Sequence, residues 1–179
     1  KQMVVAFTGY RPEKMPFYEN RRDARYLAFR TILNRVIVRL IERGCTQFIS
    51  GVARGFDTWV AEDVLALREK NPKLSLECVI PFPGQADLWK KSDQRRRYRI
   101  LISADFSVIT SEHYSSTCFF IRNRYMIDKA DVVVCAFNGQ SGGTAYTVDY
   151  ALKHDKIVIQ IDPETNVVSV ISKKTFPFQ

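Results

Sequence analysis

Three apolar segments of this chain each end in a turn that contains glycine, and this pattern restricts the fold more than any other feature. The segments are residues 3–7, 45–49 and 131–137. The third is a nearly continuous apolar run, which is typical of parallel strands that are covered on both faces. In open α/β sheets, ligands bind beyond the carboxyl ends of the strands, where such turns gather. The three turns therefore predict one composite site at a single edge of a parallel sheet.

Helical and strand patterns alternate along the whole sequence. Asp57 is interpreted as the N-cap of a helix that ends before Asn71 and Pro72. The other helices are expected over residues 21–43, 85–104 and 117–129 and after Thr144. In the helix over 85–104, Trp89, Tyr98 and Leu101 are expected to face inward. The other strands are expected over residues 74–80, 105–110, 156–161 and 167–171. This alternation predicts a single α/β domain over residues 1–179, with a doubly wound, mostly parallel Rossmann-like sheet and helices on both faces.

The turn at residues 50–57, with the sequence Ser-Gly-Val-Ala-Arg-Gly-Phe-Asp, predicts an anion site. Gly51 and Gly55 let the backbone approach a ligand, and the free N–H groups of a helix start attract negative charge. The turn with Gly142, Gly143 and Thr144 repeats this arrangement. The alternative is that the glycines serve turn geometry alone.

Charged side chains lie in the same turns. Arg11 and Arg54 are expected to bind phosphate, because a guanidinium matches phosphate oxygens in a bidentate manner; the alternative for Arg11 is a solvated loop residue. Asp57 is interpreted first as an N-cap and second as a partner for a ribose hydroxyl.

A formal net charge of +8, from 27 Lys and Arg against 19 Asp and Glu, favours anionic partners such as nucleotides or nucleic acid. The strongest basic run is Arg95-Arg96-Arg97-Tyr98-Arg99, in which arginines beside an aromatic suit single-stranded nucleic acid. The alternative is the solvated face of an amphipathic helix.

The four cysteines lie far apart, without the spacing of a metal site or a disulfide framework. Cys78 and Cys135 fall inside apolar strands, so reduced, buried thiols in a cytoplasmic protein are expected. No apolar run approaches the ~20 residues of a membrane span, and no membrane partner is expected. The sequence predicts no metal; it is compatible with a homo-oligomer but does not specify one.

The turns resemble those of the YpsA-like family of the SLOG superfamily, Rossmann-like proteins that include DprA and the LOG phosphoribohydrolases. The matching residues are Thr8-Gly9-Tyr10-Arg11-Pro12, Ser50 to Asp57, Arg122-Asn123 with Met126, and Ser141-Gly142-Gly143-Thr144. The resemblance spans nearly the whole chain and implies a nucleotide or nucleotide-derived ligand across the strand ends. It also implies a site role for Arg122 and Asn123, which would otherwise be read as a surface pair on a helix whose core stripe includes Phe119 and Phe120.

The chain departs from the LOG pattern Pro-Gly-Gly-x-Gly-Thr-x-x-Glu, whose glutamate serves cleavage of an N-glycosidic bond. Ser141 replaces the proline, and Asp149 is the candidate nearest to the position of the glutamate. The leading hypothesis is therefore a nucleotide-binding or sensor protein for an ADP-ribose- or NAD-like ligand, with no catalytic residue assigned. The alternatives are a nucleotide N-glycosidic-bond hydrolase and a DprA-like module that binds single-stranded DNA.

Overall fold

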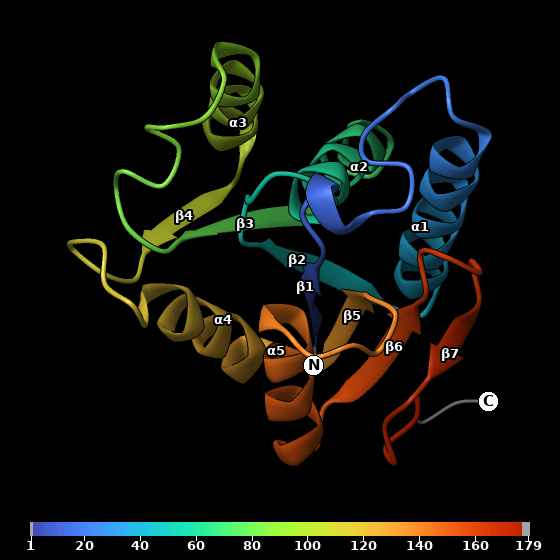
Figure 1. The fold of residues 1–179 in the computed structure, drawn as a ribbon. Helices are drawn as coiled ribbons and strands as arrows, with labels where there is room; N and C mark the ends of the chain where they lie inside the picture. Colours follow the sequence, from blue (N-terminus) through green and yellow to red (C-terminus); the bar gives the residue numbers. More distant parts are fainter. Residues whose placement is uncertain (1, 177–179) are drawn as a thin grey trace.

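A computed structural model describes residues 2–176 and shows a seven-stranded sheet between two layers of helices (Figure 1). The elements are β1 (Met3–Gly9), a short 3-10 helix (Pro12–Lys14), α1 (Ala24–Glu42), β2 (Cys45–Ser50), α2 (Phe56–Lys70), β3 (Ser75–Ile80), α3 (Lys91–Ser103), β4 (Phe106–Ile109), α4 (Cys118–Lys129), β5 (Val132–Ala136), α5 (Gly143–Lys153), β6 (Ile157–Ile161) and β7 (Val168–Val170). This confirms the predicted α/β class and the doubly wound arrangement.

The strand order is β4-β3-β2-β1-β5-β6-β7, and every neighbouring pair is parallel except the antiparallel pair β6–β7. From β1 the chain builds outward through β2, β3 and β4, and it then returns to build β5, β6 and β7 on the other side. The order therefore reverses between β1 and β5. The crevice beyond the carboxyl ends of these strands is the place where such sheets bind ligands.

The two helical layers are unequal. The helices α1 and α2 cover one face of the sheet, with α3 packed beside α2, and α4 and α5 cover the other face (Figure 1). Fully buried aromatic side chains fill the space between β1, α1 and α2, where Phe29 packs against both Phe56 and Trp59. This aromatic core fixes the start of α2 relative to the end of β1.

All four cysteines are buried and unpaired, as the sequence predicts. Burial raises the pKa of Cys45 to about 11 and of Cys78 and Cys135 to about 12, so these thiols remain protonated at neutral pH. No helix between residues 2 and 176 is both long and apolar enough to cross a membrane.

The predicted helix over residues 85–104 is shorter in the structure, because turns occupy the chain up to Trp89 and α3 begins only at Lys91. The prediction that Tyr98 faces inward is wrong: Tyr98 is 64% exposed, and Ile100 is the buried residue of α3 at 2%. The physical reason is that α3 packs along one edge of α2 and buries only a narrow stripe.

Truncation of these two side chains should distinguish the faces of α3. Ile100→Ala should lower the free energy of unfolding by about 2–5 kcal/mol, because it leaves a cavity in a packed site. Tyr98→Ala, on the exposed face, should change it by less than about 0.5 kcal/mol. Urea unfolding followed by circular dichroism measures both values, and equal losses would contradict the described packing.

Candidate functional site

A cavity of about 290 Å³ lies at the carboxyl end of β1, between the first turns of α2, α4 and α5. Its lining residues are Phe7, Thr8, Gly9, Arg11, Ala53, Asp57, Ser116, Phe119, Phe120, Arg122, Asn123, Gly143 and Thr144. Two hollows elsewhere are larger, at about 440 and 550 Å³, but neither lies where helix N-termini and glycine turns converge. The chemistry therefore identifies the smaller cavity as the candidate site.

The turn after β2 is held by its own hydroxyl groups. The Ser50 hydroxyl donates to the carbonyl of Asp57 at 2.8 Å and accepts from the N–H of Val52 at 3.2 Å. The Thr58 hydroxyl donates to the carbonyl of Ala53 at 2.7 Å. These bonds keep Val52 at a φ of +47°, a left-handed conformation that a β-branched residue seldom adopts. The turn is thus a fixed scaffold for the start of α2.

The prediction that Asp57 is the N-cap of α2 is wrong. The N-cap is Gly55, and Asp57 lies inside the first helical turn. The helix starts earlier because Gly55 adopts a φ of +84°, which brings the N–H of Phe56 within 3.3 Å of the carbonyl of Tyr10. A Cβ at Gly55 would lie 2.8 Å from that same carbonyl, so the turns after β1 and β2 meet here.

The side chain of Asp57 is buried beside the cavity. Its Oδ2 accepts a long hydrogen bond of 3.4 Å from the N–H of Ala53, and its Oδ1 has no hydrogen-bond partner within residues 2–176. Burial raises the pKa of Asp57, and the positive charges of Arg122 and Arg11 oppose this rise. A buried carboxylate oxygen without a partner is costly to the fold, and a ligand hydroxyl that reached it would relieve this cost.

The guanidinium of Arg122 is also buried, at 4% exposure. Its Nη1 donates to the carbonyl of Gly51 at 2.7 Å, and its Nε donates to Oδ1 of Asn123 at 2.7 Å. Burial lowers the pKa of Arg122 to about 10, and the negative charge of Asp57 opposes this effect. A Cβ at Gly51 would lie 2.5 Å from Nη1 of Arg122 and 3.0 Å from Oδ2 of Asp57. Gly51 is therefore required for the close approach of α4 to the turn.

The start of α5 is the third part of the site. Gly142 is its N-cap and makes no side-chain capping bond, as is also the case for α2. The amide of Asn123 donates to the Thr147 hydroxyl at 3.0 Å, and this hydroxyl donates to the carbonyl of Gly143 at 3.1 Å. This chain of bonds joins α4 to the first turn of α5, while the space around Gly143 stays open on the cavity side.

Arg11 is the exposed cation of the cavity. Its guanidinium lies over the ring of Phe119, 5.4 Å from the centroid. Within residues 2–176 it forms neither a hydrogen bond nor an ion pair with another side chain. An arginine beside a cavity, without a hydrogen-bond or ion-pair partner, is available to a bound anion.

Other predicted residues lie outside the cavity lining. Arg54 donates to Glu13 at 2.6 Å and borders a separate small hollow. Asp149 is on the exposed face of α5, where it pairs with Lys153 at 2.8 Å. Gly55 lies behind the cavity wall, where the turns after β1 and β2 meet.

The prediction that Phe119 and Phe120 belong to the core stripe of their helix is wrong, because both are half-buried and line the cavity. Each lies three residues before a predicted site residue, Arg122 or Asn123. Side chains three apart share one face of a helix, so this spacing was a usable signal.

The basic run of α3 is not a continuous free patch. Arg96 pairs with Glu19 at 2.9 Å and also with Glu62, and Arg97 donates to Gln85 at 3.3 Å. Arg95 and Arg99 are the exposed arginines of the run. Within residues 2–176, no three His, Cys, Asp or Glu side chains gather closely enough to hold a metal ion.

Comparison with solved structures supports the fold. The chain is similar to DNA processing protein A from Helicobacter pylori, whose structure was reported in a study of its single-stranded DNA binding mode, with 18% identity and a TM-score of 0.59. DprA from Streptococcus pneumoniae gives 20% identity and a TM-score of 0.58. These matches cover 88% and 89% of this chain, but the chain spans only 64% and 50% of the two DprA chains.

Comparison with curated sequences gives relatives of similar length. A UPF0398 protein of Halalkalibacterium halodurans is 27% identical over 157 residues, which cover 86% of this chain and 82% of the relative. The UPF0398 protein YpsA of Bacillus subtilis is 27% identical over 143 residues, 79% of each chain. The sequence model of the YspA SLOG family matches residues 5–165. The resemblance expected from the turn motifs is thereby confirmed, and the chain belongs to the YspA SLOG family.

Proposed function

We propose that the cavity binds the phosphate groups of a nucleotide, with an ADP-ribose- or NAD-like molecule as the ligand. The observation that carries the proposal is the convergence of two helix starts without capping side chains, those of α2 and α5, with the unpartnered guanidinium of Arg11. Each helix N-terminus carries roughly half a positive charge, although in α2 the N–H of Phe56 is already bound by the carbonyl of Tyr10. A helix start with free N–H donors is the usual setting for phosphate.

The arrangement suits a diphosphate linked to a sugar. Two helix starts provide two neighbouring anion sites, and Arg11 provides a bidentate donor. The free Oδ1 of Asp57 is the acceptor for a ribose hydroxyl. Phe119 and Phe120 offer aromatic surface to a base. Because 290 Å³ is near the lower end of ligand-pocket volumes, the cavity encloses about one nucleotide and leaves the rest of a larger ligand at its mouth.

Arg11 and Arg54 form a matched pair for testing this proposal, since both lie in glycine turns but only Arg11 lines the cavity. Arg11→Gln should weaken nucleotide binding about 10- to 100-fold, because it removes a charge-assisted contact. Arg54→Gln should leave the affinity unchanged. A panel of AMP, ADP, ADP-ribose and NAD is first screened for ligands that shift the melting temperature. Titration calorimetry with those ligands then measures the affinity of both variants. Binding by no member of the panel, or equal losses in the two variants, would contradict the proposal.

Gly143 permits a second test that does not disturb the fold. A Cβ at this position meets no atom within 4 Å, and an acidic residue at a helix start is favourable in the absence of ligand. Gly143→Asp should abolish the nucleotide-induced rise in melting temperature, since its carboxylate competes with phosphate. Gly143→Ala should retain most of the rise. If Gly143→Asp binds as well as the parent, the start of α5 is not a phosphate site.

Hydrolysis of an N-glycosidic bond is the enzymatic alternative, and Asp57 is the carboxylate among the lining residues that would have to serve it. We expect no free base when the purified protein is incubated with NAD or nucleoside monophosphates and the products are separated by chromatography. Release of base that Asp57→Asn abolishes, and that Asp149→Asn leaves intact, would assign the protein to the hydrolases instead.

Single-stranded DNA is the second candidate ligand, favoured by the fold shared with DprA and the net charge of +8. A phosphate backbone and a nucleotide use the same helix starts, so the Gly143→Asp variant also tests this function. Generic attraction of DNA to a basic protein disappears as the salt concentration rises, and the Gly143→Asp substitution should not change it. Tight binding at physiological salt that Gly143→Asp blocks would make DNA the ligand of the cavity.

A further inference from the structure

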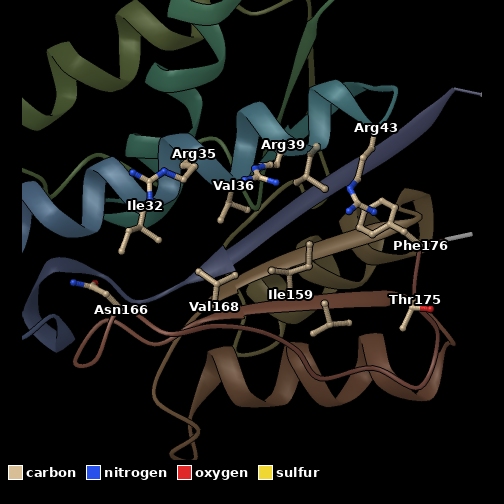
Figure 2. Close-up of a pocket in the computed structure, with 12 residues that line it drawn as sticks. Ile32, Arg35, Val36, Arg39, Arg43, Ile159, Asn166, Val168, Thr175 and Phe176 are labelled. Carbon is tan, nitrogen blue, oxygen red and sulfur yellow. The ribbon is translucent and has the colours of Figure 1, made fainter. Parts of the chain in front are cut away.

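A second concave surface lies between α1 and the strands β6 and β7, away from the cavity. Arg35, Arg39 and Arg43 project from this helix at intervals of four residues, one after another along a hollow of about 440 Å³ (Figure 2). At a rise of 1.5 Å per residue, their backbone positions are about 6 Å apart. Arg35 and Arg39 are exposed and make no ion pair or hydrogen bond within residues 2–176, and Arg43 lies over the ring of Phe176.

The floor of this hollow is apolar. It is formed by Val36 and Leu40 of α1, Ile159 of β6, and Val168 and Val170 of β7 (Figure 2). Val168 and Val170 are 44% and 50% exposed, although they belong to the sheet. In a doubly wound fold, helices cover both faces of the sheet, but here a hollow beside α1 leaves these residues of β6 and β7 as its floor (Figure 2).

The combination of a cation row and an apolar floor restricts the occupant. A partner must carry anionic groups at a pitch of about 6 Å beside an apolar stripe, which is the pattern of an amphipathic helix with acidic residues four apart. Nucleic acid has the charge but lacks the aliphatic stripe. A second copy related by a two-fold axis close to the arginine row would place the two rows beside each other, and like charges repel.

We propose that the α1–β7 groove is a docking site for an acidic amphipathic helix of a partner protein. The helix lies beside α1, places its apolar stripe on Val168 and Val170, and pairs its carboxylates with Arg35 and Arg39. This mode of recognition is common for helices in apolar grooves. The proposal is independent of the nucleotide site, because the two surfaces share no residue.

The test uses two synthetic fluorescein-labelled helical peptides of about 16 residues, a length that spans the groove. Both carry the same leucine stripe; one has Glu at three positions four apart, and the other has Lys there. The Glu peptide should bind the parent protein in fluorescence anisotropy, and the Lys peptide should not. The double variant Arg35→Glu/Arg39→Glu should weaken the Glu peptide at least about tenfold and gain binding of the Lys peptide. Val168→Asp should also weaken the Glu peptide.

A control separates docking from net charge. Arg95→Glu/Arg99→Glu changes the charge by the same amount on exposed positions of α3, and it should leave peptide binding unchanged. Equal losses in the two double variants, failure of the Lys peptide to bind the α1 variant, or no binding of the Glu peptide up to about 1 mM would overturn the proposal. So would binding of anionic lipid vesicles in place of the peptide, or self-association of the protein that Val168→Asp abolishes.

Discussion

The close packing of Arg122, Gly51 and Asp57 holds the strand ends on which the cavity is built. Arg122 donates to the carbonyl of Gly51 and, at 3.4 Å, to that of Val79, so that one side chain of α4 joins the ends of β2 and β3. The charged groups of Arg122 and Asp57 are both buried. Removing either one would leave the other uncompensated in a poorly solvated place. Because a Cβ at Gly51 would force the side chain of Arg122 to move, the three residues depend on one another. The glycine motif is thus explained by packing as well as by ligand access.

This arrangement separates the polar groups of the site into two kinds. The guanidinium of Arg122 and the amide of Asn123 line the cavity and also hydrogen-bond to protein partners, so they hold the frame of the site together. Arg11, Oδ1 of Asp57 and the open backbone at Gly143 have no such partners within the described residues. A rigid frame with a few unsatisfied groups is preorganised for binding, since little has to be ordered when the ligand arrives.

The sequence predicts the fold well because its information is local. Apolar runs, glycines and prolines locate every strand and every α-helix, although α3 begins later than predicted and the 3-10 helix is not predicted, and the parallel topology brings the turns to one edge. Side-chain direction is not local: Arg54 turns toward Glu13, which lies 41 residues away, and Gly55 becomes the N-cap because its turn meets the carbonyl of Tyr10. Neither contact leaves a periodic trace in the sequence. The motifs therefore indicate the candidate site, while tertiary contacts decide which of their residues line the cavity.

The net charge alone also does not predict which surfaces of the protein are free to bind an anion. Several arginines that contribute to the +8 charge are already neutralised in place: Arg30 by Asp63, Arg68 by Asp105 and Arg96 by Glu19 and Glu62. A basic composition consequently does not describe one continuous surface for nucleic acid. Arg11 and the pair Arg35 and Arg39 have no ion-pair partner between residues 2 and 176, and they border two different hollows. Because a cation beside a concave surface selects an anion by shape as well as by charge, the two hollows should recognise chemically different partners.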